Sequence, residues 1–100
     1  MRVATVALLC SDLLFGSNVE GALRAAGHDV RRGPGKDADV VVVDLDEFDP
    51  QTVAGARRVG FYPHVDQELR RRAVDAGFDV VVPRSRMARE TAAVVERALA

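Results

Sequence analysis

The sequence predicts an α/β domain in which a parallel β-sheet lies between layers of helices, with residues 1–100 forming one such domain. Two short apolar runs, RVATVALL and VVVV, lack polar alternation, which is typical of strands buried on both faces of a parallel sheet. Segments with helical spacing separate the strands, and two of them stop at a glycine, in AAGHDV and DAGFDV. A length of 100 residues, 48% of them hydrophobic and 29% charged, suits a single soluble core.

The first strand and the first helix are predicted within residues 2–27. Arg2–Leu9 is the strand, and the following helix ends at Gly27, since glycine tolerates the left-handed conformation found after helices. The helix begins either at Ser11 or at Ser17, where Ser17 and Glu20 have the spacing of a capping box. The apolar face of this helix is predicted to consist of Phe15, Val19, Ala22, Leu23 and Ala26.

The second and third strands are joined by a short connection. His28–Arg32 is polar enough for an edge strand and is followed by a Gly-Pro-Gly breaker. About six residues then precede the valine run within residues 38–49, whereas a parallel crossover normally needs a dozen or more. We therefore expect the second helix to be missing or reduced. The third is expected to be short, because Asp49 and Pro50 favour a helix start and Gly55 ends it at once.

Two more strands and two more helices complete the chain. The strands are Arg57–Tyr62 and Phe78–Val82. Asp66 is expected to cap the helix that ends at Gly77, and Ser85 to cap the final helix. The inward-facing residues are predicted to be Leu69, Ala73 and Ala76 in one helix and Met87, Thr91, Val94, Val95 and Ala98 in the other.

Alternating strands and helices with right-handed crossovers predict a flavodoxin-like three-layer sandwich. Its strand order, 2-1-3-4-5, places the two most apolar strands in the middle. Ligands and chemistry collect beyond the carboxyl ends of the strands in such sheets. Asp12 and Asp44 follow the first and third strands, which are neighbours in this order, so we expect the two carboxylates to lie close together.

The segments VVVVDLDEF and DAGFDVVVPRS resemble those of a response-regulator receiver domain, and the resemblance extends over nearly the whole chain. It implies that Asp44 stands at the position of the phospho-accepting aspartate. The acidic pair that holds magnesium in receivers falls on Ser11 and Asp12, the hydroxyl residue of the fourth strand on Tyr62, and the lysine after the fifth strand on Arg84.

Three of these five positions in the switch pocket differ from the receiver pattern, namely Ser11, Tyr62 and Arg84. Mg²⁺ prefers octahedral oxygen ligands, and an arginine fork does not replace a lysine without consequence. We therefore expect a diverged, pseudo-receiver form that acts in signalling or scaffolding as a protein-interaction module, with no cofactor and no catalysis of its own. The alternative is a working phospho-receiver that accepts a phosphoryl group on Asp44, with Mg²⁺ bound by Asp12 and Asp44.

Asp44 has two further interpretations, an ion pair with Arg84 that replaces phosphorylation, or a solvated strand end. Asp46 is expected to point to the other face of the strand or into the loop. Cys10 and His64 end two strands and could form a thiolate–imidazole dyad, although most lone cysteines are small core residues. The segment 16–18 could hold a phosphate at a helix start or be a turn, so a small-molecule or nucleotide site within residues 11–18 is a third class of function.

Two surfaces are candidates for contact with a protein partner or a second copy of the chain. One is the sheet face left thin by the reduced helices. The other is a basic interaction face, which suits an acidic protein, whereas few aromatic residues and a net charge of -1 argue against nucleic acid. This interaction face is predicted to consist of Arg70, Arg71, Arg84, Arg86 and Arg89.

The sequence also suggests a compartment. A single cysteine excludes an internal disulfide, and no stretch approaches the ~18 apolar residues of a membrane span. The run before Cys10 superficially resembles a lipoprotein cleavage site, but it is too short and Leu9 is too large for that role. The expected location is the cytoplasm, without membrane contact.

Overall fold

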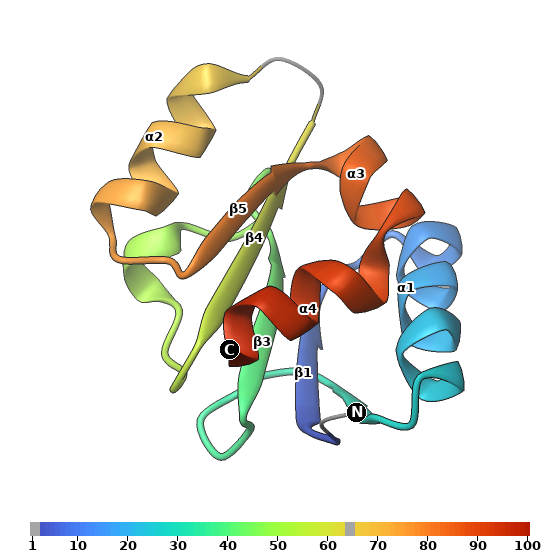
Figure 1. Cartoon of the computed structure of the whole chain (residues 1–100). Helices are drawn as coiled ribbons and strands as arrows, with labels where there is room; N and C mark the ends of the chain where they lie inside the picture. The colour runs from blue at the N-terminus through green and yellow to red at the C-terminus, as the bar shows by residue number, and fades with distance from the viewer. Residues whose placement is uncertain (1–2, 64–65) are drawn as a thin grey trace.

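The computed structural model describes residues 3–63 and 66–100. Its five strands form one parallel sheet in the order β2-β1-β3-β4-β5, as the sequence predicts (Figure 1). The elements are β1 (Thr5–Leu9), α1 (Leu13–Ala25), β2 (Asp29–Arg32), β3 (Val40–Asp44), η1 (Pro50–Thr52), β4 (Arg58–Tyr62), α2 (Gln67–Asp75), β5 (Val80–Pro83), α3 (Arg84–Arg89) and α4 (Thr91–Leu99). No helix within the described residues is long and apolar enough to cross a bilayer.

The valine run is the centre of the sheet. All five residues of β3 are buried, and the side chains of Val40 to Val43 are fully inaccessible. Alternate residues point to opposite faces of a strand, so both faces of β3 need cover. Val40 and Val42 pack in the cluster formed with α1, α3 and α4, whereas Val41 and Val43 pack in the cluster formed with α2 and the η1 region.

The cover on the η1 side is thin because the chain crosses from β2 to β3 without a helix. Gly35 lies directly on the sheet in this connection, where a Cβ would come within 2.1 Å of Val41 Cγ2. The next crossover contains only the short 3₁₀ helix η1, whose first residue is Pro50 and whose cap is Asp49, which accepts a hydrogen bond from the Gln51 amide at 3.0 Å. Both reductions confirm the sequence prediction.

The predicted helix stops after α1 and α2 are correct, since Gly27 and Gly77 have φ values of 93° and 90°. The start of α1 differs from the Ser11 and Ser17 alternatives. Asp12 caps the helix, Ser17 lies within it, and Ala22 is exposed. Glu20 therefore forms no capping box. It pairs instead with Arg24 at 2.6 Å and with Arg32 at 2.9 Å.

The final helix also differs from the prediction, because it is divided into α3 and α4 at Glu90. Ser85 does not cap it. The helix starts at Arg84 directly after β5, and Pro83 occupies the cap position without a side-chain hydrogen bond. The Thr91 hydroxyl donates to the Met87 carbonyl at 2.6 Å across the break. The predicted apolar stripe of this segment is nevertheless buried along its full length.

Candidate functional site

Three charged side chains meet at the carboxyl ends of the strands. Asp12 follows β1, Asp44 is the last residue of β3, and Arg84 follows β5. Nη2 of Arg84 donates a hydrogen bond to Oδ2 of Asp12, and Nη1 lies 3.8 Å from Oδ2 of Asp44. The structure therefore confirms that the strand order brings the two carboxylates together, and it places one guanidinium between them.

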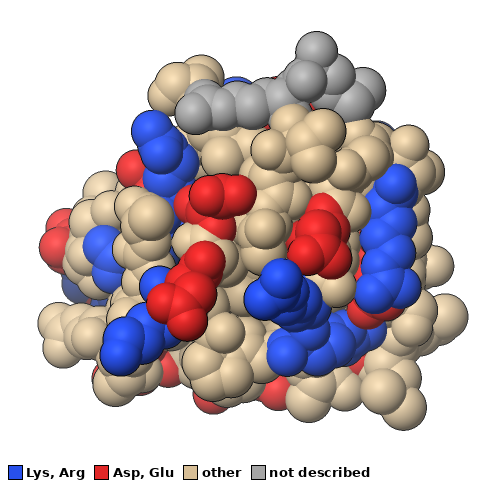
Figure 2. All heavy atoms as spheres, turned by 90° about the horizontal axis from the view of Figure 1, so that it is seen from below, with Lys and Arg blue, Asp and Glu red and all other residues tan. Residues whose placement is uncertain are grey.

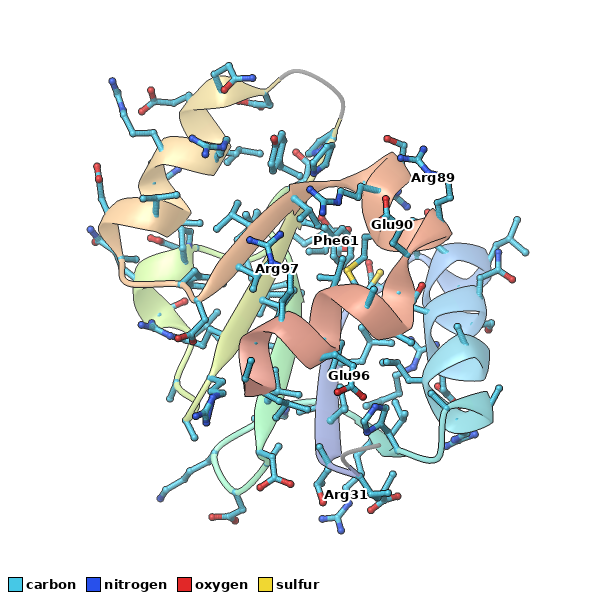
Figure 3. The ribbon with its side chains drawn as sticks, in the orientation of Figure 1. Arg31, Phe61, Arg89, Glu90, Glu96 and Arg97 are labelled. Atoms are coloured by element: carbon cyan, nitrogen blue, oxygen red, sulfur yellow. The ribbon has the colours of Figure 1, made fainter. Side chains whose placement is uncertain are left out.

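Arg84 is held in position by its surroundings as well as by the two acids. Oδ1 of Asp12 caps α1 by accepting the Phe15 amide at 3.0 Å, which leaves Oδ2 for Arg84. The guanidinium lies over the Phe15 ring, 4.3 Å from its centroid. This ring is in turn 4.9 Å from that of Phe61, which lies in the interior between the sheet and the helices (Figure 3). A cation on an aromatic face gains further attraction, so the position of the guanidinium is well determined.

Asp44 is buried, with only 2% of its surface exposed. Its Oδ1 accepts the Asp46 amide at 3.0 Å. Burial raises the pKa of Asp44, because a charged carboxylate loses hydration there, and the neighbouring Glu47 adds to the rise. The Asp46 amide and Arg84 oppose this rise by favouring the charged form.

Glu47 is a member of the site that the sequence analysis did not identify. Its Oε1 accepts the Ser11 amide at 3.1 Å, and its Oε2 accepts the Ser11 hydroxyl. The hydroxyl hydrogen bond is the largest cause that lowers the pKa of Glu47. A turn after β3, in which the amides of Glu47 and Phe48 each lie 3.1 Å from the Asp44 carbonyl, folds Glu47 back toward Ser11. The acidic run DLDE was the available signal, but the run alone does not show this turn.

The pKa of Asp12 is lowered, whereas the pKa of the Cys10 thiol is raised. The Phe15 amide, followed by Arg84, lowers the pKa of Asp12. Burial raises the pKa of the Cys10 thiol, whose Sγ lies 3.9 Å from Oδ2 of Asp44. Hydrogen bonds and Arg84 therefore stabilise the charged forms of Asp12 and Glu47. Burial opposes ionisation of Cys10 and Asp44, and at Asp44 the guanidinium of Arg84 offsets part of this effect.

The site does not fit Mg²⁺ well. Ligand atoms of Cys10, Asp44 and Glu47 lie within 4.8 Å of one another, but a thiol is a poor ligand for a cation that prefers an octahedron of oxygens. Asp12 and Asp44 both face the guanidinium of Arg84, whose charge already compensates theirs and would repel a divalent ion. The predicted Asp12 and Asp44 ligand pair is thus occupied by an internal cation.

Tyr62 does not join the switch pocket, contrary to the prediction. It is buried in the cluster on the α2 side of the sheet, with Val43, Leu45 and Ala73. Asp44 continues the alternation of Val40 and Val42 on the other side. The physical reason is strand periodicity: Phe61, not Tyr62, points toward the charged side chains, since neighbouring residues of β4 face opposite layers.

Other predicted site residues are placed as follows. Asp46 is exposed in the turn after β3, as expected. The segment 16–18 lies inside α1 and is no phosphate cradle, because the Gly16 amide is bonded to the Asp12 carbonyl at 2.8 Å. Gly16 instead admits the Arg32 side chain, which a Cβ would meet at 2.8 Å. His64, the proposed partner of Cys10, lies outside the described residues.

The predicted basic interaction face is not one continuous surface. Arg70 and Arg71 belong to α2, which packs on one side of the sheet, whereas Arg84, Arg86 and Arg89 belong to α3 on the other. Acids also pair with several of these arginines. Arg71 lies 2.6 Å from Glu68, and Arg86 and Arg89 both approach Glu90, beside which Figure 3 shows Arg89. The prediction of a common face was wrong because the arginine positions along the sequence do not show which layer each helix covers.

Acidic and basic side chains are also mixed on the end of the molecule away from the carboxyl ends of the strands. Figure 2 shows basic and acidic side chains interspersed over the face seen from below. No extended surface of one sign is visible in that view, so it offers no track for a phosphate backbone.

Solved structures of response-regulator proteins resemble this chain. NtrX from Brucella abortus matches 98% of it with a TM-score of 0.77 at 20% identity, and the match covers 27% of the NtrX chain. A response regulator from Thermotoga maritima matches 95% of it with a TM-score of 0.68 at 17% identity, over 99% of that protein. A response regulator protein from Burkholderia pseudomallei, solved with a phosphorylated aspartic acid, a calcium ion and citrate, matches 90% of it with a TM-score of 0.68 at 16% identity, over 65% of that protein.

The chain spans less than a third of NtrX, so the comparison with that protein concerns one part of it. No family model matches the sequence, and no curated protein sequence matches it. The structural neighbours include response-regulator receiver domains, and the chain has their flavodoxin-like fold, with five parallel strands in the order 2-1-3-4-5.

Proposed function

We propose that this chain is a diverged, pseudo-receiver signalling or scaffolding module in which Arg84 takes the place of a bound metal ion and holds the switch pocket in one state without phosphorylation. The observation that carries this proposal is the contact of one guanidinium with both Asp12 and Asp44. It is supported by the fold, which is that of receivers.

Phosphoryl transfer to a carboxylate needs that carboxylate to be charged, and it needs cations that neutralise the incoming phosphoryl oxygens. Asp44 meets these requirements only in part. Burial opposes its ionisation, and the nearest cation, Arg84, also holds Asp12. The guanidinium has a planar fork that binds two carboxylates at once, so it acts as an internal counter-ion rather than as a mobile one.

A module without its own chemistry acts through contacts. Leu13 and Leu14 in the first turn of α1 are 79% and 75% exposed. Large apolar side chains that lie side by side at a surface often mark an interface. Next to them, Phe15, Pro63 and Ala88 border a hollow of ≈ 430 Å³ beside Arg84. We assign this rim as the contact surface for a protein partner or for a second copy of the chain.

The test is incubation of the protein with acetyl phosphate and Mg²⁺, followed by intact-mass measurement. The proposal predicts an unchanged mass. A gain of about 80 Da, the mass of one phosphoryl group, that is lost in Asp44→Asn would overturn it in favour of a working phospho-receiver. That second function has one observation in its favour, the position of Asp44 at the end of the central strand beside Asp12.

The contact surface has its own test. The Leu13→Ser, Leu14→Ser double variant should lower self-association in sedimentation velocity, or abolish capture of a partner, while α1 stays folded by circular dichroism. The matched control is Val74→Ser, which changes an exposed apolar residue, 47% exposed, on the far side of the sheet. An equal effect of the two changes would contradict the assignment.

A further inference from the structure

We propose that the groove between the β2–β3 connection and η1 binds a small amphiphilic carboxylate, with its hydrocarbon part on Leu9, Phe48 and Val53 and its carboxylate group on the amine of Lys36. This site lies on the opposite face of the sheet from Arg84 and is independent of the function proposed above.

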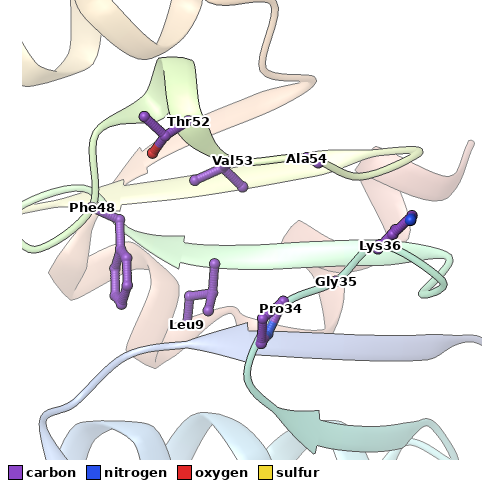
Figure 4. Close-up of a pocket in the computed structure, with 8 residues that line it drawn as sticks. All are labelled: Leu9, Pro34, Gly35, Lys36, Phe48, Thr52, Val53 and Ala54. Atoms are coloured by element: carbon purple, nitrogen blue, oxygen red, sulfur yellow. The ribbon is translucent and has the colours of Figure 1, made fainter.

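The groove exists because the crossover from β2 to β3 has no helix. It has a volume of ≈ 260 Å³, and its lining includes Leu9, Pro34, Phe48, Val53, Ala54 and Lys36 (Figure 4). A helix is about 10 Å in diameter and would not fit in such a volume, which lies just below the roughly 300 Å³ of the smallest common ligand sites and so suits only a small molecule. The size therefore favours a small ligand over a helix of a partner protein.

The loops that flank the groove already rest on the sheet. A Cβ at Gly35 would come within 2.1 Å of Val41 Cγ2, and one at Gly55 within 2.5 Å of the same atom. Because both loops contact Val41 through their backbone, they cannot settle further to close the space between them. A pre-formed site of this kind avoids much of the entropic cost of ordering on binding.

One charged group at the groove has no ion-pair partner in the part of the chain that the structure describes. Lys36 is the only lysine of the chain. Among the described residues it forms no ion pair, not even with the exposed Asp37 next to it in the sequence. Arg32 borders a second hollow that also contains Leu9 and Phe48, but its guanidinium is engaged by Glu20 and the Cys10 carbonyl. Among the described residues that line the groove, Lys36 is therefore the cation that no acid pairs with.

The placement of these groups sets the shape of the ligand. Figure 4 shows Lys36 at one end of the groove, Phe48 at the other, and Leu9 between them. An anionic group at the lysine and a hydrocarbon part that extends toward the phenylalanine match this order. A carboxylate with a chain or ring of roughly eight carbons combines the two, since small-molecule sites are mostly apolar with few orienting polar groups.

The experiment is a titration of the isotope-labelled full chain with sodium octanoate, followed by two-dimensional amide NMR. Octanoate should shift the amides of residues 35–36, 48 and 52–54 saturably. Octylamine, which has the same chain and a positive group, should not. Lys36→Gln should weaken octanoate binding about fivefold, the effect expected for a surface ion pair. Arg89→Gln on α3 is the matched control and should leave the affinity unchanged.

A second variant separates the groove from the charge. Ala54→Trp places a large side chain in the exposed mouth and should abolish the octanoate shifts while the remaining spectrum stays that of the folded protein. Equal binding of octanoate and 1-octanol, shifts centred on residues 13–14 instead of the groove, or the absence of a saturable shift would each overturn the proposal.

Discussion

Removal of the Arg84 charge is the most informative perturbation of the charged site. Arg84→Met keeps an apolar stem on the Phe15 ring and deletes the guanidinium that joins Asp12 to Asp44. The loss of the cation–π contact costs about 1 kcal/mol. The buried Asp44 loses a charge partner at 3.8 Å, which we set at about 1 kcal/mol because this carboxyl can take up a proton instead. The pair with Asp12 is exposed and adds little.

We therefore expect Arg84→Met to lower the free energy of unfolding by about 2 kcal/mol in urea denaturation, with an unchanged slope. For a domain of this size that corresponds to a fall of roughly 10 °C in Tm. On an Asp44→Asn background the loss should shrink by the Asp44 share, about 1 kcal/mol, because the neutral amide does not need a counter-ion. A loss below about 0.5 kcal/mol, or equal losses on both backgrounds, would show that Arg84 is not the counter-ion of Asp44.

Three more predictions concern pH and close packing. Asp44→Asn should gain stability relative to the wild type as pH rises from the ordinary aspartate range through the raised pKa of Asp44. The reason is that only the wild type must ionise a buried acid over this range. Urea midpoints measured across pH check this. Ser11→Ala should raise the pKa of Glu47, which carboxyl-carbon NMR measures. The variant should also lose less stability than the wild type as pH falls through the lowered pKa of Glu47. An unchanged Glu47 titration would contradict the assigned hydrogen bonds. Gly35→Ala should lower the free energy of unfolding by about 1–3 kcal/mol, since the added Cβ would overlap Val41. Gly21→Ala in α1, where no atom lies within 4 Å of the added Cβ, should raise it by about 0.5–1 kcal/mol. Similar urea midpoints for the two variants would show that the β2–β3 connection does not rest on the sheet.

The fold was predictable because its signals are local and agree with one another. Four consecutive valines define a strand that is buried on both sides, and Gly27 and Gly77 end their helices as expected. Counting residues between β2 and β3 sufficed to predict a missing helix, because the length of a crossover is a geometric requirement.

The site was predictable only where the backbone determines it. The strand order alone brought Asp12 and Asp44 together and placed Arg84 after β5. Tyr62 was misplaced because a shift of one residue along a strand moves a side chain to the other face of the sheet. Glu47 was missed because its approach to Ser11 depends on a turn that no motif in the sequence specifies. The basic face was wrong for a similar reason, since the arginine pattern does not assign α2 and α3 to layers.

We propose that Arg84 stands where a divalent cation would otherwise be bound. An amide NMR titration with Mg²⁺ that compares the wild type with Arg84→Met examines this replacement at the residues involved. We expect no saturable change at residues 11, 12 and 44–47 of the wild type. Saturable shifts at these residues should follow once the guanidinium is removed and Asp12, Asp44 and Glu47 become available. Saturable Mg²⁺ binding by the wild type, with an affinity equal to that of the variant, would contradict it.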